Sequence, residues 1–243
     1  MELSPGLRRI GTDLVAVHLL PTPEGVTIVD AGFAGHYRRV TAELRSIGAT
    51  WSDVAGIVLT HGDTDHIGFA ERARAEHDLP VYVQAADAAR ARGQEATHPA
   101  WGRWRLGATA QFMGYGAING ALRTHWLTDV TTFTGDEVLS LPGSPRAIPV
   151  PGHSPGSVAI HFPAVRALFV GDALATRHVL TGRRGIQPAP FTDDPAQAYA
   201  SLEHLAVDPS LSGDVVEWII PGHGAPYRGG VEAMLADYRA ARG

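Results

Sequence analysis

Residues 60–68 hold an unusual concentration of potential metal ligands. The segment reads Thr-His-Gly-Asp-Thr-Asp-His-Ile-Gly and directly follows an apolar stretch at 54–59. Carboxylates placed together at the end of a strand repel one another unless a cation compensates them. Imidazoles and carboxylates together are an ordinary ligand set for zinc, iron or manganese. The segment therefore predicts a metal site built in part by His61, Asp63, Asp65 and His66.

Three later segments share one design, in which an apolar strand ends in a small-residue turn that carries a His or an Asp. They read Val-Pro-Gly-His-Ser-Pro-Gly at 150–156, Phe-Val-Gly-Asp-Ala-Leu at 169–174 and Ile-Ile-Pro-Gly-His-Gly at 219–224. Glycine beside the polar residue allows the backbone to approach a metal or ligand closely. One such turn is ordinary, but three in order behind residues 60–68 favour a shared site that includes His153, Asp172 and His223.

Strands and helices alternate along the chain in an order that would bring these turns together. Apolar runs bounded by turn residues predict strands at 15–20, 26–30, 54–59, 80–84, 147–150, 157–162, 167–170 and 215–220. Apolar spacing and capping residues predict helices at 37–47, 67–77, 194–205 and 231–241. The N-cap of the third helix is expected at Asp193 or Asp194. The order favours an α/β fold of two similar halves packed face to face, as a single domain over residues 1–243.

The segment at 93–134 shows no clean period and is rich in aromatic residues. A long irregular stretch inside a compact domain is usually a lid or a binding loop. We expect it to lie over the active site, although a helical pair with a mixed core is an alternative that is compatible with a lid. His178 is also a candidate, because it follows Asp172 by six residues. The expected substrate contacts are Trp101, Trp104, Phe112, Tyr115 and His178.

With these motifs in place, nearly the whole chain resembles the metallo-β-lactamase superfamily. The family motif is HxHxDH followed by a His, an Asp and a His, and the chain matches it with His61-x-Asp63-x-Asp65-His66, then His153, Asp172 and His223. The resemblance implies an αββα sandwich with two metal ions at the sheet edge. It implies that metal one is held by His61, position 63 and His153, and metal two by Asp65, His66 and His223. Asp172 would bridge the two metals, and Asp65 would also orient the attacking nucleophile.

Asp63 is the departure from the family pattern, which usually has His at this position. That His typically binds through Nδ1, whose reach from the backbone is close to that of an Asp oxygen. We therefore predict that Asp63 is a ligand; the alternative is that it has left the metal, so that one weaker site remains. Two divalent metal ions are expected, zinc first, with iron or manganese favoured by the added oxygen donor.

The resemblance implies a metallo-hydrolase that attacks a small-molecule ester, lactone or thioester through a metal-bound hydroxide, as a lactonase does. The chain has no cysteine, so a Cys nucleophile is disfavoured. Two alternatives remain: a non-haem iron oxygenase of the same fold, and a metal-bound sensor without catalysis. Metal content would distinguish them.

Composition and charge indicate which classes of partner the protein is expected to bind. The net charge is −5, and arginines are scattered rather than clustered, so no nucleic-acid partner is expected. No apolar run approaches the roughly 20 residues of a membrane span, and no basic and apolar leader is present. We expect a cytoplasmic protein with a small-molecule substrate and no membrane partner; the sequence predicts no particular oligomeric state.

Overall fold

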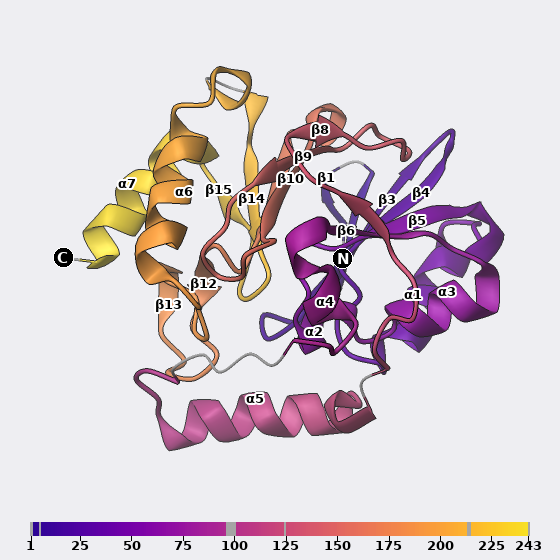
Figure 1. Ribbon diagram of the computed structural model, residues 1–243, viewed down its shortest axis with the longest axis horizontal. Coiled ribbons are helices and arrows are strands. Elements are labelled where there is room, and N and C mark those ends of the chain that lie inside the picture. Colours follow the sequence, from indigo (N-terminus) through magenta and orange to yellow (C-terminus); the bar gives the residue numbers. More distant parts are fainter. Residues whose placement is uncertain (1, 5, 96–100, 124, 213–214, 243) are drawn as a thin grey trace.

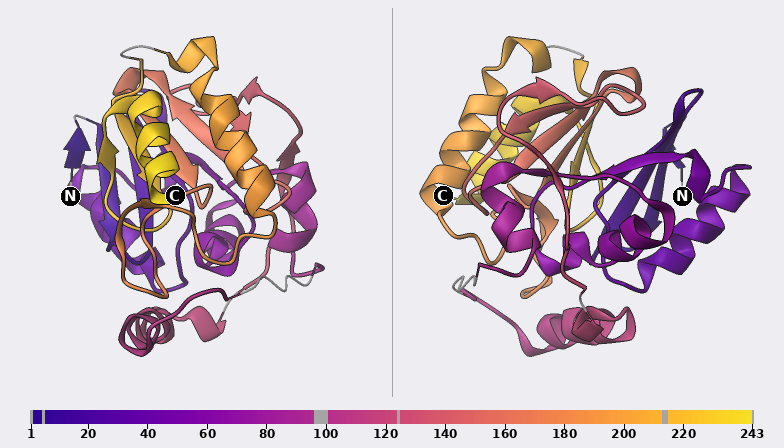
Figure 2. Two further views of the ribbon diagram at one scale, coloured as in Figure 1. Left: turned by 90° about the vertical axis from the view of Figure 1, so that its left-hand side faces the viewer. Right: turned by 45° about the vertical axis from the view of Figure 1, so that its right-hand side comes forward.

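The structure, a computed structural model, describes residues 2–4, 6–95, 101–123, 125–212 and 215–242. Two β-sheets lie against each other, and helices cover the outer face of each sheet (Figures 1 and 2). Helices α1 (His36–Ser46) and α3 (Ala70–His77) flank one sheet, and α6 (Pro195–Ala206) and α7 (Gly230–Arg242) flank the other. The predicted αββα sandwich is confirmed.

The N-terminal sheet has its seven strands in chain order. They are β1 (Glu2–Ser4), β2 (Leu7–Gly11), β3 (Ala16–Thr22), β4 (Gly25–Val29), β5 (Val54–Val58), β6 (Val81–Gln84) and β7 (Thr131–Phe133). Strands β1 to β4 pair antiparallel and β4 to β7 pair parallel. Parallel neighbours need a crossover: α1 joins β4 to β5, and α2 (Thr64–Ile67) with α3 joins β5 to β6. The connection from β6 to β7 contains α4 (Ala88–Ala91) and α5 (Leu106–Ile118).

The C-terminal sheet has the order β15-β14-β11-β10-β9-β8. Its strands are β8 (Glu137–Val138), β9 (Arg146–Pro149), β10 (Val158–Phe162), β11 (Ala167–Gly171), β14 (Trp218–Pro221) and β15 (Tyr227–Arg228). Strand β11 pairs with β14 in parallel, so their carboxyl ends meet at one edge. Strands β12 (Ala175–Arg177) and β13 (Arg184–Gln187) form a separate two-stranded ribbon.

Successive side chains of the central strands pack into different hydrophobic cores. Ile28 and Ile57 pack toward α1 and α3, whereas their chain neighbours Val29 and Val58 pack between the two sheets. Adjacent side chains of a strand point to opposite faces. Because both faces are covered, these strands are continuous apolar runs rather than alternating ones.

The turns that follow β5, β9, β11 and β14 carry the predicted ligands, and backbone hydrogen bonds hold these turns together. Val158 N–H donates to the Thr60 carbonyl at 2.9 Å, which links the two sheets. Gly222 N–H donates to the Gly171 carbonyl at 2.9 Å, which links the turns after β14 and β11. The sheet edges are therefore fixed relative to each other where the ligands emerge.

The structure differs from the sequence-based prediction in several places. Within the segment at 93–134 the helical alternative is the one that the structure shows: the segment contains the thirteen-residue helix α5, whose many Gly and Ala residues blur the apolar period. Strand β14 begins at Trp218 rather than at 215. Asp194 is confirmed as the N-cap of α6, since its carboxylate accepts from the N–H groups of Ala196 and Gln197. Among the described residues, no helix is long and apolar enough to cross a membrane.

Gly68, between α2 and α3, permits the closest packing of the ligand-bearing loop on its neighbour. A Cβ at Gly68 would lie 2.2 Å from the Gly32 carbonyl oxygen. We expect Gly68→Ala to lower the free energy of unfolding by about 1–3 kcal/mol in urea denaturation, because the backbone must move apart. Gly114→Ala is the matched control, since a Cβ there would meet nothing within 4 Å; it should raise stability by up to about 1 kcal/mol. Equal stability of Gly68→Ala and the wild type would contradict this packing.

Candidate metal centre

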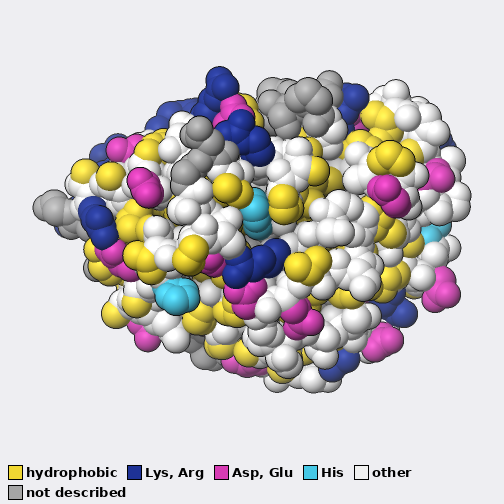
Figure 3. Space-filling view, turned by 90° about the horizontal axis from the view of Figure 1, so that it is seen from above, with side chains coloured by type: hydrophobic (Ala, Val, Ile, Leu, Met, Phe, Trp, Pro, Cys, Tyr) yellow, Lys and Arg dark blue, Asp and Glu magenta, His cyan; other side chains and the backbone are white. Residues whose placement is uncertain are grey.

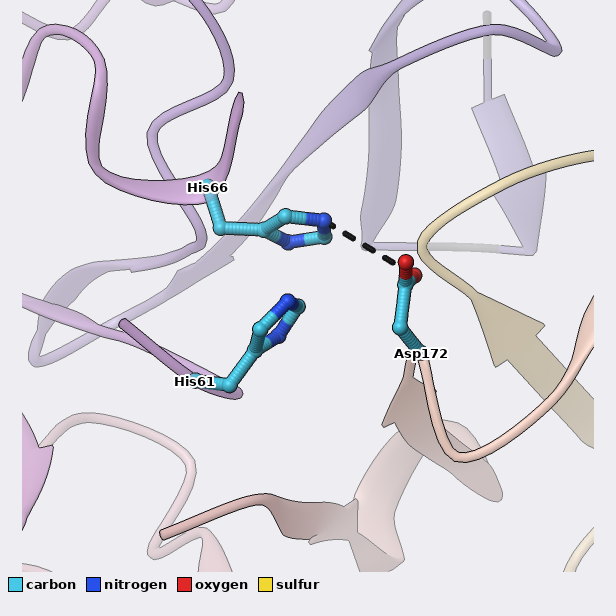
Figure 4. A group of neighbouring side chains, drawn as sticks. All are labelled: His61, His66 and Asp172. Carbon is cyan, nitrogen blue, oxygen red and sulfur yellow. Dashed lines mark ion pairs between the residues drawn. The ribbon is translucent and has the colours of Figure 1, made fainter. Parts of the chain in front are cut away.

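All seven predicted ligand side chains lie in one cluster. Three subsets place their ligand atoms within 4.8 Å of one another: His61, Asp63 and His153; Asp65, His66 and His223; and His61, His66 and Asp172. The first two are the sets that the family resemblance implies for metals one and two, and the third joins them. Figure 4 shows His61 and His66 beside each other with Asp172 opposite, which comes from the turn after β11. Metal binding itself stays a prediction.

Each of the four imidazoles directs Nε2 into the cluster and is held from behind through Nδ1. The Nδ1 partner is Thr60 Oγ1 at 3.1 Å for His61, Asp30 Oδ2 at 2.9 Å for His66, Thr192 Oγ1 at 3.3 Å for His153 and the Leu14 carbonyl at 2.5 Å for His223. A partner at Nδ1 fixes the ring and the tautomer that leaves the Nε2 lone pair free for a metal.

Asp30 anchors both histidines of the loop after β5. It follows β4 with a φ of 59° and is buried. Its carboxylate accepts from the Thr60 N–H at 2.8 Å, from the Thr60 hydroxyl at 3.0 Å and from His66 Nδ1 at 2.9 Å. Because the same hydroxyl contacts Nδ1 of His61, Asp30 orients His66 directly and His61 through Thr60.

The cluster contains buried polar atoms that the chain does not satisfy. Among the described residues, His61 Nε2, His66 Nε2 and Asp172 Oδ1 have no hydrogen-bond partner. Such an atom costs about 1–3 kcal/mol when it is left unsatisfied. Imidazole nitrogens and carboxylate oxygens are suitable donors for a divalent metal. The residues present therefore fit metal ions between them.

The electrostatics of the cluster favour a bound cation. Burial lowers the pKa of the His66 imidazole, but the carboxylates of Asp30 and Asp65 outweigh it and raise that pKa to about 10. Burial lowers the pKa of His61 well below its usual value, and the neighbouring His66 and His153 act in the same direction. When no cation is bound, the carboxylates thus favour a proton on His66. Metal binding would displace that proton.

Asp63 and Asp172 lie where the resemblance places a ligand and a bridge. Asp63 Oδ2 is 3.2 Å from His153 Nε2. Asp172 Oδ2 is 3.8 Å from His153 Nε2 and 3.1 Å from His223 Nε2, so it reaches both ligand sets. Gly222 makes room for this carboxylate, since a Cβ there would lie 2.2 Å from Asp172 Oδ1.

A further buried carboxylate, that of Asp87, joins two of the ligand-bearing turns. It accepts from the Gly62 N–H at 2.8 Å, the Ser154 hydroxyl at 2.7 Å and the Gly156 N–H at 2.6 Å. Burial raises the pKa of Asp87, and the three hydrogen bonds oppose that shift. One side chain thereby sets the separation between the loop after β5 and the turn that carries His153.

Five of the seven side chains line a cavity of about 660 Å³, namely Asp63, Asp65, His153, Asp172 and His223. Its apolar lining comes largely from α5 and the residues that follow that helix. The apolar lining residues include Phe33, Phe112, Met113, Ala117, Leu122, Trp126 and Phe191. Small-molecule sites typically have this size and this character.

Phe112 is the predicted substrate contact that lines the cavity, with its ring centroid 5.8 Å from that of His223. Trp101 does not line the cavity. Its ring contacts the ring of Phe191, which is a lining residue, and the two ring centroids are 5.6 Å apart.

The structure does not bring the other three predicted contacts to the cavity wall. Trp104 is 56% exposed and lies outside the lining. The Tyr115 hydroxyl lies 3.0 Å from His36 Nε2, so it joins α5 to the start of α1. His178 Nδ1 accepts from two N–H groups of the turn that follows it. Tyr115 and His178 therefore have evident structural roles.

Three charged residues around the site were missed in the sequence: Asp30, Asp87 and Arg90. Asp30 follows an apolar strand and precedes Ala31 and Gly32, which is the placement of the other motif residues, so a signal was present. Asp87 and Arg90 lie in an alanine-rich stretch at 85–91 that matches no motif. Only the tertiary structure brings them beside the ligands.

Comparisons with known proteins show the family that this chain is similar to. The family model of the metallo-beta-lactamase superfamily matches residues 10–223. The chain is 26% identical over 242 residues to the probable metallo-hydrolase YflN of Bacillus subtilis (strain 168), with 94% of this chain and 87% of that protein covered.

Solved structures give the same fold. A metallo-beta-lactamase family protein from Thermus thermophilus, TTHA1429, superposes with a TM-score of 0.67 at 22% identity, covering 98% of this chain and 81% of that one. TTHA1623, solved in a di-iron-bound form, superposes with a TM-score of 0.60 at 25% identity, covering 93% of this chain and 96% of that one.

Asp30 gives a direct test of how the ligands are held. Asp30→Asn removes the charge that orients His66, so we expect metal affinity to fall about 10- to 100-fold, as for other groups that support metal ligands. Competition with a chelator measures the affinity. Asp129→Asn, at a side chain that is 77% exposed, is the matched control and should bind as the wild type does. Unchanged affinity in Asp30→Asn would show that Asp30 does not orient a ligand.

Proposed function

Because the chain belongs to the metallo-beta-lactamase superfamily, we propose that it is a dinuclear metallo-hydrolase of a small-molecule ester, lactone or thioester. The observation that carries this proposal is the convergence of two ligand sets and a shared carboxylate at one apolar cavity. The relative named as a probable metallo-hydrolase supports the reaction class. The size and lining of the cavity support the class of substrate.

The seven side chains are assigned to two proposed metal ions. Two divalent ions would supply a water of lowered pKa and polarise the group that it attacks. The side chains that would hold them are His61, Asp63 and His153 for one, Asp65, His66 and His223 for the other, and Asp172 for both. The four histidines and Asp172 are buried, whereas Asp63 and Asp65 are partly exposed.

Asp65 is the carboxylate placed to act on the attacking water. Its side chain is 16% exposed and lines the cavity, with Oδ2 at 3.4 Å from His223 Nε2. Asp172 is less exposed, at 5%, and both its oxygens face imidazoles. Asp65 would therefore accept a hydrogen bond from the water, so that a lone pair of the water oxygen points toward the substrate carbonyl, as general-base geometry requires.

The cavity wall supports a substrate with an uncharged, apolar part. Phe33, Phe112, Met113 and Leu122 are among its apolar lining residues. The charged groups of the lining, apart from the seven, are Arg90 and Glu95. Basic and acidic side chains are intermixed on the upper face, which Figure 3 shows and which is the side away from α5. The net charge of −5 and the scattered arginines disfavour a nucleic-acid substrate.

Zinc is the first candidate metal, and iron or manganese is the alternative. Asp63 adds an oxygen donor where the family usually has imidazole, which suits the harder metals. The similar protein TTHA1623 was solved in a di-iron-bound form. This favours a second candidate function, a non-haem iron oxygenase of the same fold. A metal-bound sensor would bind the ions and turn over nothing.

The test is a panel of lactones, thioesters, aryl esters and phosphodiesters offered to protein loaded with defined zinc, iron or manganese. We expect hydrolysis of a lactone, thioester or ester, with about two metals per chain. One iron per chain with oxygen consumption would favour the oxygenase. Tight metal binding with no turnover on any substrate would favour the sensor.

Phe112 tests the role of the cavity wall in the same assay. Phe112→Ala should raise KM for substrates with a large apolar group and leave KM for the smallest substrate of the same class nearly unchanged, because only the large group reaches the wall. Leu106→Ala is the control, since Leu106 lies on the same helix, is 75% exposed and does not line the cavity. Equal effects of both variants on all substrates would assign α5 a structural role only.

A further inference from the structure

Arg90 is the charged group that adjoins the one ligand position departing from the family pattern. It lies in α4, is 4% exposed and has its Nε 3.4 Å from Asp63 Oδ1. Its Nη2 donates to Asp193 Oδ2 at 2.6 Å. A buried guanidinium is costly unless carboxylates compensate it, and here two carboxylates face the same planar group.

The two oxygens of Asp63 have different neighbours. Oδ2 lies 3.2 Å from His153 Nε2 and 3.6 Å from His61 Nε2, so this oxygen completes the first ligand set. Oδ1 faces Arg90 instead. A carboxylate that is free to turn can bind a metal through one oxygen or through both, whereas the imidazole usual at this position offers one atom.

We propose that Arg90 is a positioning residue that holds Oδ1 of Asp63, so that Asp63 presents Oδ2 alone to the metal held with His61 and His153. Asp63 and Arg90 then act as one unit that replaces the family's histidine. The arginine limits the carboxylate to one ligand atom, and its positive charge offsets the third carboxylate of the cluster. The proposal rests on the metal centre of the proposed function, but not on the reaction catalysed there.

The surroundings of Arg90 explain how it is itself held in place. Asp193 accepts from its Nη2, and the Asp193 N–H donates to the His153 carbonyl at 3.1 Å. Thr192, the preceding residue, contacts His153 Nδ1 at 3.3 Å. The guanidinium thus connects the backbone segment behind His153 with the carboxylate in front of it. A planar group with fixed donors suits this role better than a flexible ammonium.

A competing account is that Arg90 only ties α4 to the loop at Asp193. The two accounts differ in one respect: positioning of a carboxylate matters only while position 63 is a carboxylate. The experiment therefore measures Arg90→Met and Arg90→Lys, each in the wild type and in Asp63→His. Zn²⁺ affinity and stoichiometry come from chelator competition, and the coordination number comes from the absorption spectrum of the Co²⁺ form.

In the wild-type background we expect Arg90→Met to weaken binding of one metal about 10- to 100-fold. The Co²⁺ absorption of that variant should become weaker, because a second carboxylate oxygen raises the coordination number. In Asp63→His the same change should leave affinity and spectrum unaltered. Arg90→Lys keeps the charge but loses the planar guanidinium, so its metal affinity and Co²⁺ absorption should lie between those of the wild type and those of Arg90→Met. Arg92→Met is the control, since Arg92 adjoins the same helix and its nearest carboxylate is Asp129 at 3.9 Å.

Unchanged Zn²⁺ affinity and Co²⁺ spectrum in Arg90→Met would overturn the proposal, as would an equal loss in both backgrounds. If circular dichroism shows that Arg90→Met does not fold, the test rests on Arg90→Lys. A wild-type Zn²⁺ affinity and Co²⁺ spectrum in Arg90→Lys would then overturn the proposal. A wild-type protein that binds neither Zn²⁺ nor Co²⁺ would overturn the metal centre as well, which distinguishes that failure from a failure of this inference alone.

Discussion

Three carboxylates and four imidazoles lie within a few ångströms of one another with little access to water, and the rest of the structure depends on this crowding of charge. Like charges in a buried site cannot all ionise unless an opposite charge is added. Without a cation, the neighbouring carboxylates raise the pKa of His66 to about 10 despite its burial, which favours a proton on this imidazole. Divalent ions would replace that proton and satisfy His61 Nε2, His66 Nε2 and Asp172 Oδ1 at the same time.

The fold makes this arrangement possible by supplying ligands from the ends of strands that belong to two sheets. The apolar cores around the sheets fix those strands, and a few buried polar groups fix the turns. Asp30 holds the histidines of one loop, and Asp87 spans two loops. Because each of the four histidine ligands is held from behind, their geometry exists before a metal arrives, which is the preorganisation that a catalytic site needs.

Much of this was predictable, and the reasons for the exceptions are physical. The long apolar runs and the His and Asp turns predicted the sandwich and the cluster, because buried parallel strands and metal ligands leave local patterns. Helix α5 was predicted only as an alternative, since its Gly and Ala residues weaken the 3.6-residue period. Trp104 lies outside the cavity, because an aromatic residue in a loop need not face the site. Arg90 left no pattern at all: its role depends on Asp63 and Asp193, which are 27 and 103 residues away in the chain.

The most direct test of the account is the anomalous scattering from crystals of metal-loaded protein, measured at the absorption edge of the metal. The account predicts two peaks about 3.5–4 Å apart, one in contact with His61, Asp63 and His153, the other with Asp65, His66 and His223, and Asp172 between them. A single peak, or a pair that leaves His153 or His223 without contact, would contradict the dinuclear centre.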